Sequence, residues 1–377
     1  MPSRRVLIAF HEPVLGGATL SVLRVIPRLE QRGWSFSFWA PRPSDLYDQL
    51  AARGHEVAGA PRFIQYSGRA LRLPPGPRRR LASVPSYVRA YRAFLRKAGP
   101  QLVHANSIIC IAEALIAKRD GYPVLLHVHE MLPTGLRGRL MRQAAWRRLD
   151  AVVAVSAASA AAMSLGTRTP RIVYEAASVP DEPAVIRDSP LPFTVGTVAV
   201  VSTRKGSDLF VDAAEMLLAR KDARYSFEMV GAPNDAVERD WATGLLGRAL
   251  ASGIAHRDRA DVAECLRRWD LFVLPSRADP FPISMLEAMA SGLPVVGTAV
   301  DGLTEQVTDS CGLLVPADDP AALAGAIERM RASPRRQRAA MGAAGRERVA
   351  SRFSLDHQAE ALDDAYRAAL SWAPRRR

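Results

Sequence analysis

Residues 271–315 read LFVLPSRADPFPISMLEAMASGLPVVGTAVDGLTEQVTDSCGLLV. The first four residues are apolar and a proline follows them, so this run predicts a short buried strand that stops at Pro275. After a polar loop, the apolar residues of 283–289 recur at helical spacing. The stretch therefore predicts a strand, a loop and a helix, which is the repeating unit of a parallel α/β sheet.

Two carboxylates, Asp279 and Glu287, lie on either side of the predicted helix start. A helix N-terminus offers unpaired backbone N–H groups and a partial positive charge, which suit a diphosphate. Glu287 lies about one turn inside the helix, where a carboxylate can accept hydrogen bonds from hydroxyl groups. The segment therefore predicts a site at which an anion and hydroxyl groups are recognised together.

The spacing of these two acids and the residues around them resemble the E-x7-E region of the retaining glycosyltransferases of family 4. The resemblance implies the GT-B fold, an α/β architecture of two facing Rossmann-like domains, each a doubly wound parallel sheet, with a deep cleft between them. Four further matching pieces occur in the expected order, so the resemblance covers nearly the whole chain. They are Gly16-Gly17, His129 after the run PVLLHV, AVVAVS at 151–156, and Arg204-Lys205-Gly206.

The chain has 377 residues, which is too long for one ordinary core and suits two domains of roughly 150 to 200 residues. We expect a first domain over 1–180, a Pro-rich linker over 181–192 and a second domain over 193–355. The resemblance implies that a last helix, 356–377, crosses back onto the first domain. In both domains apolar runs alternate with helical stretches, which predicts parallel sheets.

The strand candidates of the two domains are 5–10, 35–39, 102–104, 124–128, 151–155, 193–201, 226–230, 271–274, 294–297 and 312–315. One segment, Pro61 to Pro85, is rich in Arg and Pro and breaks the alternation. We expect it to form a mobile loop beside the acceptor site. Pro27 lies inside a predicted helix over 18–32 and is expected to kink it.

The resemblance assigns the two acids to the donor substrate, a nucleotide sugar. In the family the second acid holds the ribose hydroxyls of the nucleotide, which implies that role for Glu287. The first acid contacts hydroxyls of the donor sugar, and here it is Asp279, shorter than the usual Glu by one methylene. The alternatives are a surface glutamate on a helix and an aspartate that caps the following turn.

The loop between the two acids departs from the family. The family has Gly-Phe-Gly, and this chain has Pro280-Phe281-Pro282, so two backbone N–H donors that could meet the sugar are missing. We expect Phe281 and the backbone amides of Ile283 and Ser284 to complete this part of the nucleotide-sugar site. A proline at the helix start also makes the turn rigid.

Arg204-Lys205-Gly206 resembles the pyrophosphate clamp of the family, in which a cation neutralises the charge that grows on the leaving diphosphate. Lys205 matches the family's lysine, whereas the family's upstream arginine is Val200 here and the glycine before it is Ala199. Arg204 is the candidate for the second cation. A solvated lysine in a turn is the alternative for Lys205.

In the predicted first domain, Gly16 and Gly17 resemble paired glycines whose backbone approaches phosphate or acceptor. Tight turns also use glycine, so this pattern is less specific. His129 matches a histidine that contacts the donor near the reacting carbon, and its alternative is an ordinary core histidine. His104 and His127 are weaker candidates of the same kind. With Asp279 and Lys205, His129 completes the set that we assign to catalysis.

The sequence predicts no metal site and no cofactor apart from the nucleotide sugar as co-substrate. No two aspartates stand two positions apart, which disfavours the metal-bridged diphosphate of the other large glycosyltransferase fold. No P-loop or H-E-x-x-H motif is present. The resemblance implies retention at the anomeric carbon by front-face attack, with the leaving phosphate helping to take the acceptor proton.

The formal charge of +13 lies in the first half, because residues 1–188 hold 27 Lys and Arg against 13 Asp and Glu. Residues 136–149, LRGRLMRQAAWRRL, interleave Arg with apolar residues as interfacial helices do, so peripheral contact with an anionic membrane is a candidate role. A solvated helix face is the alternative. We expect no nucleic-acid partner, because no recognition motif accompanies the arginines.

Three widely spaced cysteines and the absence of a signal-peptide core indicate a cytoplasmic protein, soluble or at the inner face of the membrane. The leading hypothesis is a metal-independent, retaining hexosyltransferase that uses a UDP- or GDP-linked sugar and a glycan or lipid-linked acceptor in cell-surface polysaccharide or glycolipid synthesis. The alternative is an inactive nucleotide-sugar-binding subunit that regulates a partner transferase. Hydrolysis or epimerisation of a nucleotide sugar also stays open.

Overall fold

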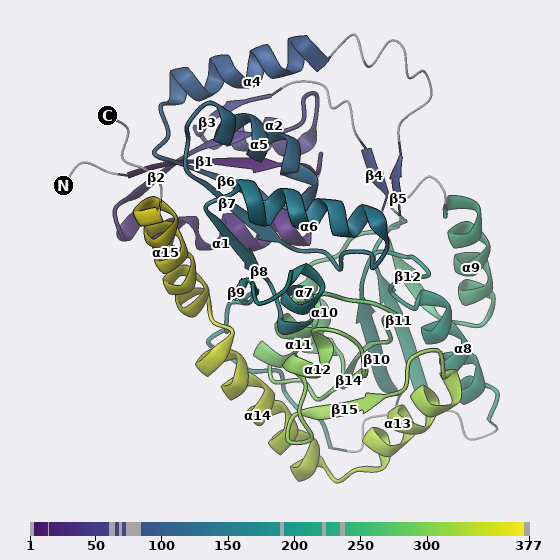
Figure 1. The fold of residues 1–377 in the computed structure, drawn as a ribbon. Coiled ribbons are helices and arrows are strands. Elements are labelled where there is room, and N and C mark those ends of the chain that lie inside the picture. The colour runs from purple at the N-terminus through teal and green to yellow at the C-terminus, as the bar shows by residue number, and fades with distance from the viewer. Residues whose placement is uncertain are drawn as a thin grey trace. The chain divides into compact units, whose positions relative to one another are not determined.

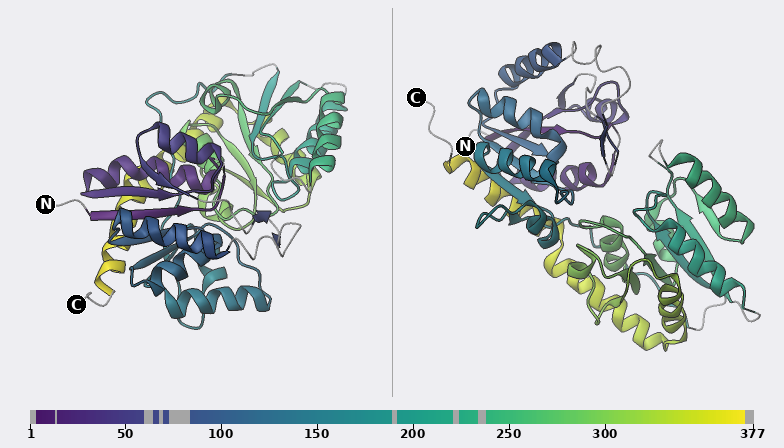
Figure 2. Two further views of the ribbon diagram at one scale, coloured as in Figure 1. Left: turned by 90° about the horizontal axis from the view of Figure 1, so that it is seen from above. Right: turned by 45° about the vertical axis from the view of Figure 1, so that its right-hand side comes forward.

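The computed structural model describes residues 4–13, 15–59, 65–67, 70–72, 84–188, 192–220, 224–233 and 238–372. The chain forms two compact units, one of Met1–Tyr174 with Leu355–Arg377 and one of Glu175–Ser354. Each unit is built on its own parallel sheet, labelled in Figure 1 and seen from two further sides in Figure 2. Among the described residues, no helix is both long and apolar enough to cross a membrane.

The sheet of the first unit has seven strands, and all neighbouring strands run parallel. The strands are β1 (Arg4–Phe10), β2 (Trp34–Trp39), β3 (Glu56–Ala58), β6 (Leu102–Asn106), β7 (Val124–Val128), β8 (Ala151–Ala154) and β9 (Arg171–Ile172). Their order is β3-β2-β1-β6-β7-β8-β9. Helices flank the sheet (Figure 2), so its central strands are buried on both faces and carry continuous apolar runs.

The helices of the first unit are α1 (Gly17–Gln31), α2 (Asp45–Ala52), α4 (Val84–Ala98), η1 (Ile108–Cys110), α5 (Ile111–Arg119), α6 (Leu136–Arg148), α7 (Ala157–Met163) and α15 (Leu355–Trp372). Helix α1 contains Pro27 and continues past it to Gln31. Of the expected loop Pro61 to Pro85, most lies outside the described residues. The described part includes a short antiparallel pair, β4 (Gln65–Ser67) and β5 (Ala70–Arg72).

The second unit has a six-stranded parallel sheet. Its strands are β10 (Phe193–Val198), β11 (Tyr225–Val230), β12 (Ala255–Arg257), β13 (Leu271–Leu274), β14 (Val295–Thr298) and β15 (Gly312–Val315), in the order β12-β11-β10-β13-β14-β15. Its helices are α8 (Ser207–Leu218), α9 (Arg239–Ala251), α10 (Val262–Arg268), α11 (Ile283–Ala290), α12 (Leu303–Gln306), α13 (Pro320–Ala332) and α14 (Arg335–Arg352).

The strand order reverses once in each sheet, between β1 and β6 and between β10 and β13. The first six strands of each sheet, counted in chain order within that sheet, therefore follow the Rossmann order 3-2-1-4-5-6. This confirms the predicted fold class of two doubly wound parallel sheets. It also marks the place in each unit where ligands bind in such sheets, which is outside the carboxyl ends of the strands at the reversal.

Residues 181–192 are the expected linker between the domains. The described residues of this segment belong to the second unit. The reason is specific bonding: the Ala184 amide donates to the Ser291 carbonyl over 2.6 Å, and Arg187 pairs with the buried Asp270. The C-terminal helix α15 belongs to the first unit, where Tyr366 meets His104 on β6 over 2.8 Å.

Each unit has its own aromatic core. In the first, Trp39 on β2 packs with Tyr87, Tyr91 and Phe94 of α4, and its indole N–H donates to the Tyr87 hydroxyl over 2.9 Å. In the second, rings on β10, β11 and α8 pack together, with Phe210 edge-on to Phe227. These cores fix the sheets from which the site loops extend.

Candidate active site

Two loops meet at the strand reversal of the second unit. The segment 199–206 joins β10 to α8, and the segment 275–282 joins β13 to α11. Because β10 and β13 are parallel neighbours, both loops leave the same edge of the sheet. The backbone amide of Arg277 donates to the carbonyl of Arg204 over 2.8 Å, so the two loops contact one another directly.

Lys205 and Asp279 form an ion pair at this meeting point. Lys205 Nζ lies 2.5 Å from Asp279 Oδ2, and the two side chains are 14% and 5% exposed. The Ser276 hydroxyl donates to the same carboxylate oxygen over 3.1 Å. Burial lowers the pKa of Lys205, the Asp279 charge opposes this, and the neighbouring Arg204 adds to the lowering. The pair therefore places a cation and a carboxylate within reach of one ligand.

The backbone of Asp279 is held on both sides. Its amide donates to Asp301 Oδ2 over 2.8 Å, and its carbonyl accepts from the Gly302 amide over 3.1 Å. Asp301 has a φ of 38°, a conformation that L-residues rarely adopt. These two hydrogen bonds fix the backbone position from which the Asp279 side chain extends.

Arg204 and Gly206 fix the first loop to the second. Arg204 Nη1 donates to the Ala278 carbonyl over 2.9 Å, so this guanidinium, the candidate second cation, reaches the carboxylate loop. Gly206 has a φ of 66°, and a Cβ there would lie 1.9 Å from the Pro275 carbonyl oxygen. Only glycine fits this close approach without moving the backbone.

The helix α11 follows directly. Pro282 stands at its N-cap position, and Ile283 and Ser284 form its half-buried first turn. Glu287 lies one turn further on and is half-buried. The ring of Phe281 is buried edge-on against Phe353, with centroids 5.4 Å apart, so packing accounts for this side chain.

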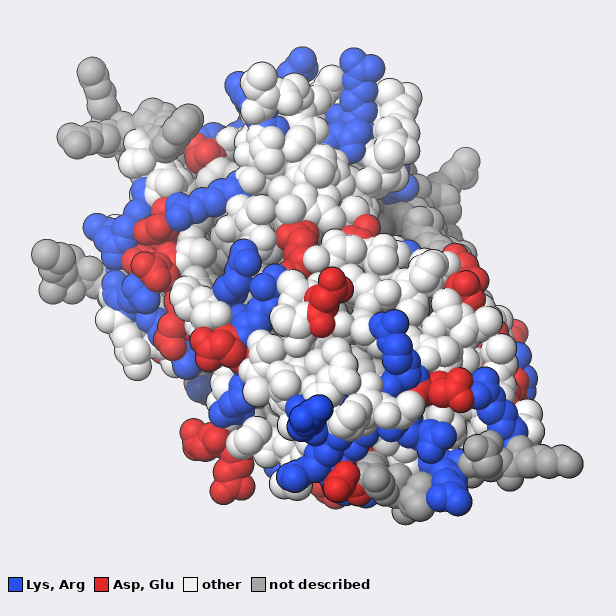
Figure 3. Space-filling view, turned by 90° about the horizontal axis from the view of Figure 1, so that it is seen from below, with Lys and Arg blue, Asp and Glu red and all other residues white. Residues whose placement is uncertain are grey.

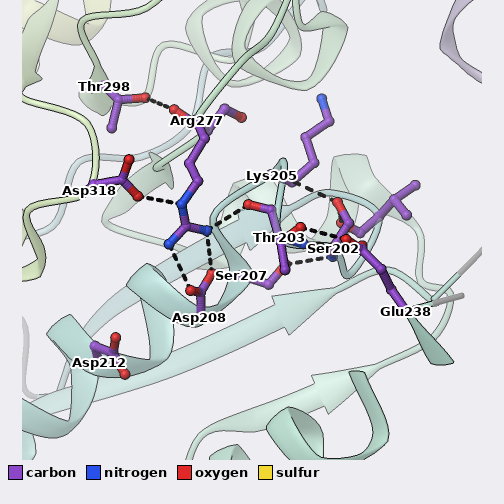
Figure 4. A network of polar contacts seen from close by, with 12 residues as sticks. Ser202, Thr203, Lys205, Ser207, Asp208, Asp212, Glu238, Arg277, Thr298 and Asp318 are labelled. Atoms are coloured by element: carbon purple, nitrogen blue, oxygen red, sulfur yellow. Dashed lines mark hydrogen bonds and ion pairs between the residues drawn. The ribbon is translucent and has the colours of Figure 1, made fainter. Parts of the chain in front are cut away.

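Arg277 connects the two loops to a wider network (Figure 4). Its guanidinium donates to the Thr203 carbonyl over 2.6 Å, to both carboxylate oxygens of Asp208 over 2.7 and 2.8 Å, and to Asp318. The Thr203 hydroxyl in turn bonds Glu238. Sequence reasoning missed Arg277, because a loop arginine has no signal of its own; its proximity to the first acid was the only hint.

The strand reversal of the first unit carries a second group of polar residues. His129, after β7, lies with its Nε2 2.9 Å from Asn106 Oδ1, at the end of β6. The Asn106 amide nitrogen donates to the Ala18 carbonyl over 3.0 Å, so its oxygen faces the histidine. Because that oxygen only accepts, His129 Nε2 carries the proton. Asn106 therefore fixes the tautomer of His129.

Glu130 ties the ends of the same two strands together. Its carboxylate accepts from the Ser107 hydroxyl, from the Ile108 amide over 3.3 Å and from the His129 amide over 3.1 Å. Burial raises the pKa of Glu130, while these bonds oppose the rise. Ser107 has a φ of 126°, a strained conformation of the kind found at functional sites. Polar residues directly after buried strands were the sequence signal that could have indicated this group.

Three histidine rings line up beside this group. His127 lies 5.4 Å from His104 and 4.2 Å from His129 between ring centroids. Burial lowers the pKa of His129 to about 3 and lowers the pKa values of His104 and His127 as well. All three are therefore neutral at pH 7.

Gly16 and Gly17 begin helix α1 at the same edge of the sheet. Gly16 faces the Glu12 carboxylate, whose Oε2 would lie 2.1 Å from a Cβ at that position. Thr19 donates to the same oxygen over 3.3 Å. A carboxylate thus lies beside the helix start where the paired glycines predict an approach to phosphate or acceptor.

The structure brings the predicted residues into two groups. Lys205, Arg204 and Asp279 meet in the second unit, and α11 with Glu287 follows them in the same unit. Gly16 and Gly17, after β1, and His129, after β7, lie at the carboxyl edge of the sheet of the first unit. The residues that sequence reasoning did not single out are those that brace these groups, mainly Asn106, Ser107, Glu130, Asp208, Arg277 and Asp301.

Two Rossmann-like units with these groups at their strand reversals define a protein of the GT-B class, and solved structures share the fold over nearly the full chain. HepE of Anabaena with UDP-glucose has a TM-score of 0.80 at 18% identity, covering 97% of this chain and 99% of that one. Sucrose-phosphate synthase of Thermosynechococcus elongatus has a TM-score of 0.76 at 21% identity, covering 98% and 99%.

The chain belongs to the family 4 glycosyltransferases. The family described as Glycosyl transferases group 1 matches residues 192–333, and the one described as Glycosyltransferase Family 4 matches residues 15–173. The predicted family is therefore confirmed.

Two curated relatives are similar over part of their length. The lipopolysaccharide core biosynthesis mannosyltransferase LpsB of Rhizobium meliloti is 32% identical over 237 residues, 58% of this chain and 66% of that protein. The D-inositol 3-phosphate glycosyltransferase of Salinispora tropica is 34% identical over 191 residues, 48% of this chain and 39% of that protein.

Proposed function

We propose that this protein transfers a hexosyl unit from a UDP- or GDP-linked sugar to a glycan or lipid-linked acceptor in the synthesis of cell-surface polysaccharide or glycolipid. The observation that carries the proposal is the contact of Lys205 with Asp279 at the strand reversal of the second sheet. A buried cation suits the diphosphate and a carboxylate suits sugar hydroxyls. HepE, solved with UDP-glucose, supports a nucleotide-sugar donor, and LpsB, a mannosyltransferase, supports transfer of a hexose.

The proposed reaction retains the configuration at the anomeric carbon. The bond from that carbon to the diphosphate oxygen breaks, and the acceptor oxygen bonds on the same face. The acceptor proton passes to the leaving diphosphate. Lys205, Arg204 and the N-terminus of α11 would neutralise the diphosphate, so no metal is needed in this proposal.

The remaining predicted residues keep their proposed roles, apart from Phe281, whose ring packs against Phe353. Glu287 would hold the ribose hydroxyls, and the amides of Ile283 and Ser284 would meet the diphosphate or sugar. Gly16, Gly17 and His129 would act at the acceptor and at the donor near the reacting carbon. His129 is neutral, so it would serve as a hydrogen-bonding group and not as a cation.

Calorimetric titration with UDP, GDP and ADP, followed by a transfer assay with the matching sugars, tests the proposal. Wild-type protein should bind one diphosphate selectively, with or without EDTA, and Glu287→Ala should lose at least tenfold in affinity. Glu347→Ala, an exposed glutamate on α14 of the same unit, should bind like wild type. If no nucleotide binds, or if both variants behave alike, the proposal is wrong.

We further propose that the protein works in the cytoplasm at the inner face of the membrane and that α6 contacts anionic lipid. Leu136 and Leu140, one turn apart on α6, are 73% and 56% exposed, and no acidic residue lies on this helix. Arg137 and Arg139 stand beside them. The face of the molecule seen from below in Figure 3 differs, because its basic side chains stand among acidic ones. Such a mixture is typical of a surface in contact with water. Leucine beside arginine suits an anionic bilayer surface.

The alternative of an inactive nucleotide-sugar-binding subunit has no observation in its favour. The substitutions that motivated it are compatible with an ordered site: Pro282 stands at the N-cap position of α11, and its carbonyl accepts from Gln306 over 3.1 Å. We propose no nucleic-acid partner, as the sequence motifs predict.

A further inference from the structure

Three non-glycine residues among those described have a positive φ: Ser107, Asp301 and Asp318. Two of them hold the loop 275–282. Asp301 accepts from the Asp279 amide, and Asp318 accepts from Arg277 Nε. Strained backbone persists only where its surroundings enforce it, and it concentrates at sites that need a fixed geometry. The loop 275–282 is therefore held by two residues, Asp301 and Asp318, whose own backbone conformation is strained.

Arg277 is the centre of this arrangement. Its two terminal nitrogens form a fork on the carboxylate of Asp208, at the first turn of α8, over 2.7 and 2.8 Å. The fork geometry is specific to arginine. The hydrogen bonds to Asp208 raise the pKa of Arg277, burial opposes the rise, and Asp318 adds to it. Arg277 thus connects three segments of the second unit.

The segment that Arg277 holds is the one that carries Lys205. The Thr203 carbonyl accepts from Arg277 Nη1 over 2.6 Å, and the Arg204 carbonyl accepts from the Arg277 amide over 2.8 Å. The Lys205 amide itself has a weaker contact, with the Ser202 hydroxyl over 3.3 Å. No strand or helix includes residues 202–206. The position of the Lys205 backbone therefore depends on these loop contacts.

We infer that Arg277 is a positioning residue that holds segment 202–206 where Lys205 meets a nucleoside diphosphate. This inference rests on the proposed function and deepens it. Arg277 does not itself need to touch the ligand, because its donors are already directed to Thr203, Asp208 and Asp318. Loss of Arg277 should move Lys205 away from the outer phosphate and leave the base and ribose contacts intact.

The test compares diphosphate with monophosphate. Arg277→Met should weaken binding of the preferred nucleoside diphosphate at least tenfold while binding of the matching monophosphate stays within about twofold. Arg277→Lys should fall between, because a lysine reaches one acceptor and cannot form the fork on Asp208. Arg220→Met removes an exposed arginine paired with Glu328 in the same unit and should change neither constant. Equal losses for both nucleotides, or no loss, would overturn the inference.

Amide hydrogen exchange separates this inference from the proposed function. If wild-type protein binds no nucleotide, the proposed function fails, and positioning is still measured by exchange at residues 202–206. Faster exchange there in Arg277→Met, with unchanged exchange in β10 and in the Arg220→Met control, supports positioning. Unchanged exchange at 202–206 in Arg277→Met contradicts it.

Discussion

Lys205 Nζ lies 2.5 Å from Asp279 Oδ2, although 74 positions separate the two residues in the chain. The two candidate ligand-binding groups therefore neutralise each other. Neither charge is left alone in a buried place, and each keeps the other oriented. Under the proposed function, a diphosphate would share Lys205 with Asp279, because an ammonium has three donors.

The first prediction concerns this pair. Lys205→Met and Asp279→Asn should each lower the free energy of unfolding by about 2–4 kcal/mol, since each leaves the partner buried without its counter-charge. The double variant should lose less than the sum. Urea unfolding of the four proteins measures the coupling. Additive losses would show that the contact does not contribute, and the exposed pair Arg220–Glu328 provides a control expected to couple by less than about 1 kcal/mol.

The second prediction concerns Gly206. Gly206→Ala should destabilise the protein by about 2 kcal/mol or more, because φ is 66° and the new Cβ would meet the Pro275 carbonyl. Affinity for nucleoside diphosphate should fall with it. The control is Gly244→Ala on α9, where no heavy atom other than those of the adjacent residues and the local helix backbone lies within 4 Å of the new Cβ. That substitution should be neutral or stabilise by up to about 1 kcal/mol. Similar melting temperatures for both variants would refute the prediction.

The third prediction is a pH dependence of stability. The folded protein keeps His104, His127 and His129 neutral, because burial lowers their pKa values, to about 3 for His129. In the unfolded chain they protonate near pH 6.5. The unfolded state therefore binds more protons below pH 6.5, and stability falls as pH falls through that value. Between pH 7.5 and 5.5 each histidine should cost about 1.4 kcal/mol.

Urea unfolding at pH 7.5 and 5.5 measures this loss in wild type and in His127→Phe. The variant should lose roughly 1.4 kcal/mol less than wild type over the same interval. His357→Gln removes an exposed histidine on α15 and should retain the wild-type loss. An identical pH dependence in all three proteins would mean that the buried histidines protonate in the folded state.

The fourth prediction concerns α6. Replacing Leu136 and Leu140 with serine should reduce binding to vesicles that contain phosphatidylglycerol by at least tenfold, because two exposed leucines can no longer enter the bilayer surface. Co-sedimentation at low and high salt measures both the apolar and the charge contribution. Leu250→Ser, an exposed leucine on α9, should have no effect. If neither wild type nor variant binds vesicles, α6 is a solvated helix.

Much of the fold follows from local sequence. Leu271–Leu274 and Val124–Val128 form the strands β13 and β7 with the predicted limits, because apolar runs bounded by proline or polar residues match buried parallel strands. Strand β12 was not predicted, since Ala255–Arg257 is a short edge strand with no apolar run. Strand β10 ends at Val198, three residues before its predicted end at Val201.

The candidate site was predictable as a set of residues but not as a set of contacts. The family resemblance indicated Lys205 and Asp279 separately, and nothing local relates positions that far apart. Arg277 and Asn106 were not predicted for the same reason, because their hydrogen-bond partners come from other loops and helices. The identities of bracing residues depend on tertiary geometry, which periodicity does not encode.

The membership of α15 in the first unit has a consequence for how the protein is made. Residues 175–354 form the second unit without interruption, whereas the first unit needs α15, whose Asp363 accepts from the buried Trp34 indole over 2.8 Å. A ribosome completes the second unit while the first still lacks one of its helices. The first unit can therefore complete its packing only after α15 has been synthesised, and a fragment cut at residue 174 would expose the side chains that α15 covers.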